Sequence, residues 1–277
     1  MKNICLLLVV LIPIGLASVQ SAEPIPDIMN MLSLISSDTL QAYAQHLQDY
    51  QTRYALADNH LDIANWIMAR FQSYGFTNTW MQEYQHQNTT QYNVIATIPG
   101  SQYPDIYVIA GAHYDSYSED TNNFVFAPGA DDNASGTAGL LEMARVMMAT
   151  GYQPRCSIRF IAFSAEEGAG WGSEAYCNYA ITENHNIRLM VNQDMIAANL
   201  QPSNEFLVVP YTGSEDDCLE AMSISRQYGS FIPLTGILNM GSDSYIFSQN
   251  GFDAVFFMER YLNTNYHSSA DVIDILD

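Results

Sequence analysis

The feature that most constrains this chain is a series of short apolar runs that alternate with helix-like stretches. Residues 106–110 (Ile-Tyr-Val-Ile-Ala) are continuously apolar, and residues 157–163 form a second, mostly apolar run. Buried parallel strands look like this because helices cover both faces of their sheet. Between the two runs, residues 134–149 place four apolar side chains on one helical face: Ala138, Leu141, Ala144 and Met148. The alternation predicts an α/β three-layer sandwich around a central, mixed but mostly parallel β-sheet.

The same patterns predict the remaining elements. Helices are expected over 37–57, 59–74, 172–184, 214–228 and 243–250, and strands over 79–84, 91–98, 188–194, 204–209 and 254–258. The 277 residues are 48% hydrophobic, which suits one large core. Neither an internal repeat nor a linker is visible, so residues 23–277 are expected to form a single catalytic domain.

The first 22 residues have the pattern of a secretory signal peptide. Lys2 is basic, an apolar stretch follows, and small residues lead to Ala22. Pro13 and Gly15 interrupt a stretch already too short to span a bilayer comfortably, which argues against a membrane anchor. We therefore expect a secreted or periplasmic protein without stable membrane association. Whether a propeptide follows residue 23 is left open.

Charge and cysteine content narrow the function classes. The chain has 9 Lys+Arg against 30 Asp+Glu, a net charge of −21. Nucleic acid is a poor partner for such a chain, because too few cations are available to neutralise phosphates. Beyond the signal peptide, the cysteines are Cys156, Cys177 and Cys218, which permit one disulfide or none. We expect all three to be small side chains buried in the apolar core. The oligomeric state is not predictable from these features.

Side chains able to bind a metal follow the apolar runs or lie in adjoining loops. They are His113, Asp131, the pair Glu166-Glu167, Asp194 and His267. Each alone has an ordinary structural explanation, such as a turn former or a solvated carboxylate. Ligands in open α/β sheets bind beyond the carboxyl ends of strands, and most of these residues are expected there. Their combination therefore predicts one shared site.

These segments (AGAHYDS, GADDNASG, SAEEGAG, NQDMI and YHSSAD) resemble, in order and spacing, the motifs of the co-catalytic zinc aminopeptidases, the M28 metallopeptidases. The resemblance covers roughly residues 50–277. It implies a zinc-peptidase fold and a metallo-exopeptidase that removes N-terminal residues from peptides with a water activated by two zinc ions.

The resemblance also implies a role for each matching residue. His113 and Asp194 would bind one zinc ion, Glu167 and His267 the other, and Asp131 would bridge the two. Glu166 would be the general base. Asp115 would accept the outer N–H of His113 and fix its tautomer.

Three departures from the family pattern carry expectations of their own. Ser244 stands where many relatives have a histidine. Some relatives also carry a tyrosine shortly before this segment that helps to hold the oxyanion, and this chain has Asn239 or Met240 there instead. Asp243 is expected either to cap a helix, which is the favoured interpretation, or to support a metal ligand from behind. Residues 271–277 would begin a last helix with Ile273 and Leu276 exposed.

Two other functions are compatible with the same scaffold. One is a glutaminyl-peptide cyclotransferase that uses a single zinc ion, and the other is a binding module without catalysis. The complete set of ligand types and the intact Glu166 argue against both. Tyr117, Phe124, Phe126, Trp171 and Tyr176 could line a substrate pocket, although these aromatics equally suit the core or the rim. Such a pocket favours an apolar N-terminal residue, whereas the acidic balance of the chain would permit Lys or Arg.

Overall fold

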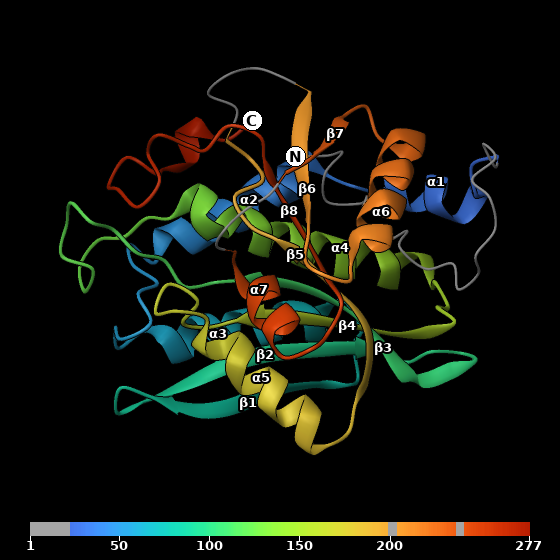
Figure 1. Ribbon diagram of the computed structural model, residues 1–277. Coiled ribbons are helices and arrows are strands. Elements are labelled where there is room, and N and C mark those ends of the chain that lie inside the picture. The colour runs from blue at the N-terminus through green and yellow to red at the C-terminus, as the bar shows by residue number, and fades with distance from the viewer. Residues whose placement is uncertain (1–22, 199–203, 237–240) are drawn as a thin grey trace.

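The structure is a computed structural model that describes residues 23–198, 204–236 and 241–277. The predicted signal peptide and the positions Asn239 and Met240 lie outside the described residues. The centre of the molecule is one eight-stranded sheet with the strand order β1-β2-β4-β3-β5-β8-β6-β7 (Figure 1). Its strands are β1 Thr79–His86, β2 Thr89–Ile98, β3 Tyr103–His113, β4 Cys156–Phe163, β5 Asn186–Gln193, β6 Glu205–Pro210, β7 Ile232–Thr235 and β8 Ala254–Glu259.

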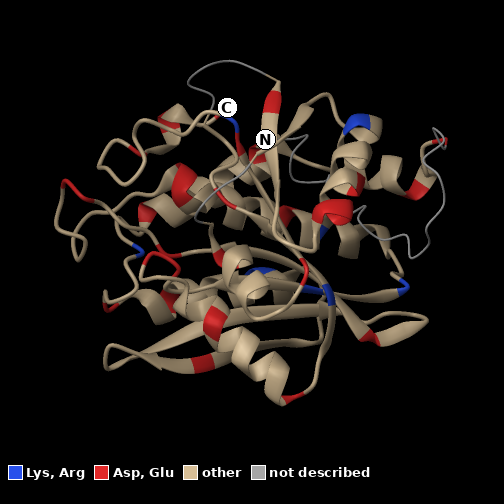
Figure 2. Cartoon of the chain, in the orientation of Figure 1, with Lys and Arg blue, Asp and Glu red and all other residues tan. Residues whose placement is uncertain are grey.

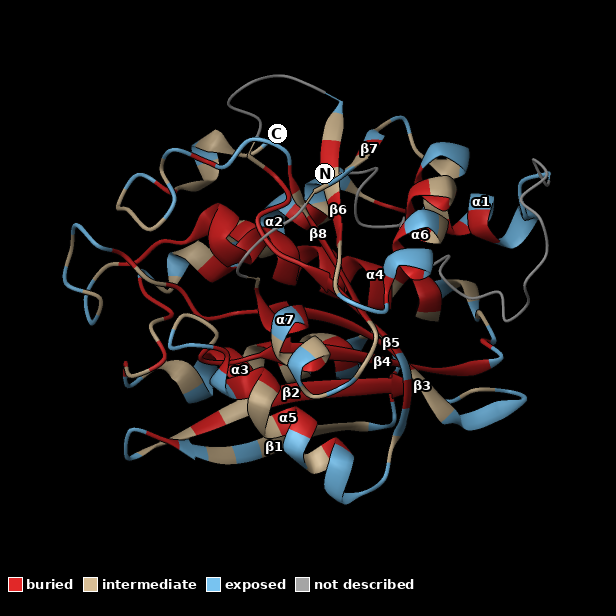
Figure 3. Ribbon diagram, in the orientation of Figure 1, coloured by how far each residue is buried: buried red, intermediate tan, exposed pale blue. Residues whose placement is uncertain are grey.

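The predicted mixed, mostly parallel sheet is confirmed. Strands β4, β3, β5 and β8 lie side by side and run parallel, whereas β2 pairs antiparallel with β4 and β6 antiparallel with β8. The parallel centre is the part buried on both faces, as Figure 3 shows by its continuous burial. The carboxyl ends of β4, β3 and β5 are consequently neighbours at one edge.

Helices cover both faces of the sheet. Their bounds are α1 Pro26–Ser33, α2 Ser37–Asp49, α3 His60–Ser73, α4 Gly136–Thr150, α5 Trp171–Thr182, α6 Glu215–Tyr228 and α7 Asp243–Gln249. Helices α1, α2, α3, α4 and α6 pack on one face of the sheet through the larger core cluster. Helices α5 and α7 pack on the other face through a second cluster. Alternation along β4 feeds both clusters, since Phe160 packs into the first and Ile161 into the second.

Two elements were not predicted, and one was predicted too long. The short helix α1 and the four-residue strand β7 have too little periodicity to be recognised. Helix α2 ends at Asp49 rather than at residue 57, because Gln51 has a left-handed backbone (φ 64°) and Thr52 bridges to Ala127. The chain therefore turns from α2 towards the loops at the edge of the sheet.

The C-terminal segment does not expose an apolar strip, so that expectation is wrong. Residues Ile273–Ile275 form one short turn of 3-10 helix, and both Ile273 and Leu276 pack against the larger core cluster. Leu276 also bridges to Ala198, and the Ile273 amide donates to Gln48 Oε1 at 2.6 Å. These contacts hold the segment against α2.

The acidic character of the chain and the buried cysteines are both visible in the structure. Figure 2 shows acidic residues over most elements and few basic ones. Cys156, Cys177 and Cys218 are buried free thiols, as expected of small apolar residues. None of the helices in the described part of the chain is both long and apolar enough to span a bilayer.

Replacing a core aromatic gives a direct test of the two-sided core. Phe160→Ala removes a side chain that is 1% exposed and should lower the free energy of unfolding by about 3–5 kcal/mol, because it leaves a cavity. Urea denaturation measures the loss. Phe124→Ala, at a position 59% exposed, is the matched control and should change stability by less than about 0.5 kcal/mol. Equal losses would contradict the assignment of Phe160 to the core.

Candidate metal centre

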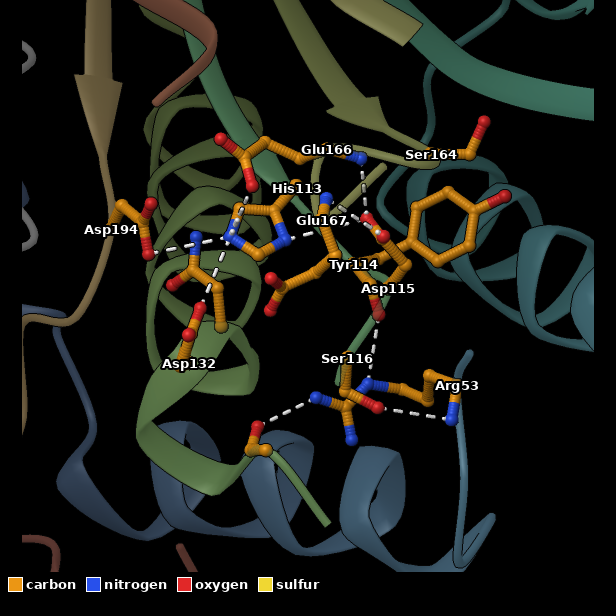
Figure 4. Close-up of polar contacts among 12 residues, drawn as sticks. Arg53, His113, Tyr114, Asp115, Ser116, Asp132, Ser164, Glu166, Glu167 and Asp194 are labelled. Carbon is orange, nitrogen blue, oxygen red and sulfur yellow. Dashed lines mark hydrogen bonds and ion pairs between the residues drawn. The ribbon is translucent and has the colours of Figure 1, made fainter. Parts of the chain in front are cut away.

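The candidate site lies at the carboxyl edge of the parallel strands, where the sequence predicted it. His113 is the last residue of β3, Glu166 and Glu167 follow β4, and Asp194 follows β5. Because β4, β3 and β5 are adjacent, their ends bring these side chains together without further folding (Figure 4). The turn before α4 adds Asp132, and the loop after β8 adds His267.

Two groups of three side chains share one carboxylate. In the first, His113 Nε2 lies 3.3 Å from Asp132 Oδ1 and 3.4 Å from Asp194 Oδ1. In the second, His267 Nε2 lies 3.3 Å from Asp132 Oδ2 and 2.8 Å from Glu167 Oε2. Asp132 therefore offers one oxygen to each group.

The spacing fits a small divalent ion in each group. Tetrahedral zinc with bonds of about 2.0–2.1 Å separates its ligand atoms by roughly 3.3 Å. Three of the four separations to the histidine nitrogens have this value within 0.1 Å. A single carboxylate that serves both groups suits ions about 3.5–4 Å apart.

Unpartnered polar atoms support the same conclusion. Among the described residues, buried atoms of both groups form no hydrogen bond; they include His113 Nε2, Asp194 Oδ1 and His267 Nε2. Buried polar atoms are nearly always partnered, so a concentration of orphaned nitrogen and carboxylate oxygen marks an intended ligand. Imidazole nitrogen and carboxylate oxygen are zinc donors, and the residues therefore fit a pair of zinc ions.

The prediction that Asp131 bridges the two groups is wrong, because its neighbour Asp132 occupies that position. Asp131 points the other way, and its Oδ1 accepts from the amides of Ala197 and Ala198 at 3.0 Å each. Asp132 has an extended backbone (φ −106°, ψ 91°). Because the backbone leaves the helical conformation at Asp132, the two adjacent side chains point in different directions, and only the Asp132 carboxylate faces the histidines.

Asp115 lies behind His113, where the resemblance implied a supporting carboxylate. Its Oδ1 is 3.4 Å from His113 Nδ1, the ring nitrogen turned away from the shared site. The same carboxylate accepts from the backbone amides of Glu166 at 3.0 Å and Glu167 at 3.2 Å. Asp115 thereby ties the end of β3 to the loop after β4.

Glu166 occupies the rim of the site and belongs to neither group of three. Its Oε2 is 4.0 Å from His113 Nε2. Its side chain is 18% exposed and that of His267 is 16% exposed, against 1% for His113 and 5% for Asp132. The site therefore opens to solvent beside Glu166 and His267.

Comparison with known proteins identifies the family. Residues 93–277 match the family described as Peptidase family M28. The chain belongs to this family. A probable aminopeptidase of Saccharomyces cerevisiae is 29% identical over 82% of this chain and 64% of its own length. A probable leucine aminopeptidase of Arthroderma otae is 30% identical over 92% of this chain and 71% of its own. The M28 chain thus spans less than two thirds of the yeast protein.

Solved structures show the same fold. The LapA aminopeptidase of Legionella pneumophila superimposes with a TM-score of 0.81 at 23% identity, covering 94% of this chain and 73% of that one. A glutaminyl cyclase of Bacteroides thetaiotaomicron superimposes with a TM-score of 0.70 at 18% identity, covering 88% and 92%. At such identities the likeness establishes the fold and leaves the reaction to the site.

The charges of the M28 site shift its pKa values strongly. Burial alone would lower the pKa of His267, but the neighbouring carboxylates of Asp132 and Glu167 favour its charged form and raise the pKa to about 10. Burial raises the pKa of Glu167 to about 8, with a further contribution from the Asp132 charge. Burial acts against ionisation of Asp132 too, yet its bonds to both histidines hold its pKa well below the usual range.

The other predicted residues are divided between rim and core. Tyr117 packs edge-on against His267 with ring centroids 5.2 Å apart, and Phe124 is exposed on the same loop. Tyr176 is fully buried against Phe247, so it cannot line a substrate pocket. Trp171 is 44% exposed, and its ring packs against the buried ring of His86.

Asp243 is not a helix cap. Ser242 holds the cap position of α7, and the Asp243 carboxylate is fully buried with neither oxygen hydrogen-bonded. Burial raises the pKa of Asp243 to about 7, while the His113 charge acts in the opposite direction. Asp243 is therefore a buried acid near the site whose ionisation is disfavoured by burial.

Sequence reasoning missed Tyr211 as well as Asp132. The Tyr211 hydroxyl bonds to Ser244 Oγ at 3.0 Å, and the charges of Asp194, Asp243 and Glu166 act on it. Its burial and these charges raise the pKa of Tyr211 to about 12. The available signal was its position directly after β6. A polar side chain that follows an apolar strand is a candidate for the site, as Asp194 is after β5.

A pair of adjacent substitutions tests the corrected bridge. Asp132→Asn should weaken zinc retention by more than the roughly 10–100-fold that loss of an outer hydrogen-bond partner costs, because both groups lose a ligand charge. Asp131→Asn is the matched control and should retain both ions. Equilibrium dialysis with zinc measures the two variants, and stronger loss from the Asp131 variant would overturn the correction.

The metal-free protein should lose stability as pH rises. The raised pKa of His267 contributes stability below about 6.5 that disappears as pH passes through about 10. The raised pKa of Glu167 acts in the same direction, since ionising this buried acid becomes costly between 4.5 and about 8. Calorimetry in chelator should show the melting temperature falling across this window, and added zinc should reduce the slope. A melting temperature of the chelated protein that rises with pH would contradict the assignment.

Proposed function

We propose that this chain is an aminopeptidase that removes N-terminal residues from peptides through a water activated by two zinc ions. The observation that carries the proposal is the sharing of Asp132 between two groups of zinc donors, His113 with Asp194 and Glu167 with His267. Membership of the M28 family and relatives named as aminopeptidases support it.

The charges of the donor set suit two zinc ions. The shared Asp132, Asp194 and Glu167 bring three negative charges, and a bound hydroxide would supply the fourth against two divalent cations. A neutral arrangement of this kind is tolerable in a largely buried site. Bound zinc would polarise the scissile carbonyl and lower the pKa of the attacking water towards about 7.

Glu166 is the residue proposed to move the proton. It lies at the open side of the site, and its backbone is held by Asp115, so its carboxylate can reach a water placed between the two groups. Burial raises the pKa of Glu166 well above its usual value, with the His113 charge opposing the shift. A carboxylate with a raised pKa is a better base near neutral pH and can return the proton to the leaving amine.

Recognition of a free N-terminus follows from the charge at the rim. A peptide's α-ammonium carries one positive charge, and the partly exposed side of the site carries acidic side chains, Asp194 as well as Glu166. An internal peptide bond presents no such charge. We therefore propose cleavage from the end of the chain only.

An apolar N-terminal residue is the proposed preference. Phe124 and Val125 are 59% and 63% exposed, and they belong to the loop whose Tyr117 contacts His267. Exposed apolar side chains beside a polar site suit an apolar substrate group. The name of the Arthroderma otae relative, a probable leucine aminopeptidase, agrees with this preference.

The second candidate, a glutaminyl cyclase, is favoured by one of the structural neighbours. It would need one zinc ion, which leaves no purpose for the second group of donors around His267. We also propose export by the signal peptide predicted over residues 1–22, which N-terminal sequencing of the secreted protein would test.

Substitution of the proposed base separates these functions. Purified wild-type protein should bind two zinc ions and hydrolyse leucyl- or phenylalanyl-anilides faster than lysyl-anilides, and chelator should abolish the reaction. Glu166→Gln should retain both ions and lose about 100-fold or more in kcat, because no base accepts the proton. One ion per chain with cyclisation of N-terminal glutamine would support the cyclase instead. Near-normal hydrolysis by Glu166→Gln would refute the proposed mechanism.

A further inference from the structure

Arg53 is a buried cation in the segment between α2 and α3, and it belongs to neither group of candidate metal ligands. It is 1% exposed, and its guanidinium donates to four backbone carbonyls, with distances of 3.2 Å to Leu47, 2.8 Å to Tyr114, 2.7 Å to Pro128 and 2.6 Å to Gly129. Across the described ranges, no carboxylate forms an ion pair with it. Burying a charge without a counter-ion is costly, so the arrangement needs a reason.

The loops that Arg53 joins both carry candidate ligands. Tyr114 follows His113 directly, and Pro128 and Gly129 open the turn that leads to Asp132. One rigid guanidinium therefore spans the end of β3 and the turn before α4 (Figure 4). The Arg53 backbone amide also donates to Ser116 Oγ at 3.1 Å, and that hydroxyl donates to the Ala127 carbonyl. This second chain of hydrogen bonds connects the residues after β3 with those before the turn.

Asp271 holds the same turn from the other side. Its Oδ1 accepts from the amide of Asp131 at 2.9 Å and its Oδ2 from that of Asp132 at 3.1 Å. The peptide groups of residues 128–132 thus lie between a buried guanidinium on their carbonyls and a buried carboxylate on their amides. Hydrogen bonds to charged groups are stronger than neutral ones, so both ends of the turn are firmly held.

Gly129 permits this close approach. Its backbone is left-handed (φ 50°), and a Cβ there would lie 2.9 Å from Arg53 Nη2 and 2.3 Å from Asp132 O. Any side chain at this position would push the turn away from the guanidinium. Arg53, Gly129 and Asp271 therefore form one interlocked unit around the backbone of Asp132.

We propose that Arg53 is a positioning residue for the metal centre, which fixes the Asp132 carboxylate relative to His113 by clamping turn 128–132 against Asp271. The inference rests on the proposed two-zinc site. Arg53 lies outside residues 93–277, the part of the chain that matches the family. The proposal therefore gives the segment between α2 and α3 a role in the metal centre in addition to its packing. Both zinc ions depend on the clamp, because Asp132 serves both groups.

Zinc affinity is the measurement that separates positioning from plain stability. Wild type, Arg53→Met and Arg53→Lys are titrated with zinc against a chromophoric chelator, at a temperature where circular dichroism shows each to be folded. Both variants should bind zinc about 10–100-fold more weakly, as expected when an outer partner of a metal ligand is lost. Lysine should not rescue, because a single ammonium cannot donate to carbonyls on both loops at once.

Arg159→Met is the matched control. Arg159 is also a buried arginine, 6% exposed, but its guanidinium contacts Thr97, Tyr176 and His185, none of which lies on a loop bearing a ligand. This variant should lose thermal stability and keep the zinc affinity of wild type. Asp271→Asn weakens the opposite side of the clamp and should lower zinc affinity as the Arg53 variants do. If Arg53→Met does not fold, the zinc affinity of Asp271→Asn tests the positioning role in its place.

Wild-type affinity in the folded Arg53 variants, or in Asp271→Asn alone if they do not fold, would overturn the positioning role. An equal loss of affinity in Arg159→Met would overturn it too, since general destabilisation would then account for the effect. Failure of the proposed function has a different signature, because wild-type protein itself would then not bind two zinc ions.

Discussion

One buried carboxylate, Asp132, is the constraint around which the rest of the site is arranged. It is 4% exposed and must satisfy two imidazoles at once, one on each oxygen. Glu167 and Asp194 lie close enough that the three acids repel one another unless cations intervene. The strongly shifted pKa values of the metal-free protein are the electrostatic cost of this arrangement, and divalent ions would remove most of it.

The sheet and the loops divide the work of assembling the centre. Adjacent parallel strands place His113, Glu167 and Asp194 at one edge with little freedom, because each side chain lies at the end of a buried strand or just beyond it. The two remaining ligands come from loops and need separate restraints. Asp132 is held through its turn, and the segment with His267 is tied to Glu119 and Asp120 by backbone and side-chain bonds.

This division explains how much the sequence could predict. Apolar runs specify buried strands, so the sheet, the carboxyl edge and the strand-borne ligands followed from the pattern. The choice between Asp131 and Asp132 did not, because it depends on backbone direction. That direction is set by Arg53 and by Asp271, both far from the turn in sequence. Arg53 itself gave no signal, because arginine is rarely fully buried and residues 37–57 were predicted to be helical.

The fold alone does not determine the reaction, because an aminopeptidase and a glutaminyl cyclase both superimpose on this chain. What differs between such reactions is the number of cations that the carboxyl edge can hold. A second cation requires a second imidazole and a carboxylate free to face both groups, and here His267 and Asp132 meet that requirement. On the proposed two-zinc mechanism, the turn that directs Asp132 towards both groups decides whether this scaffold can hold a second cation, and the residues that hold the turn matter as much as the ligands themselves.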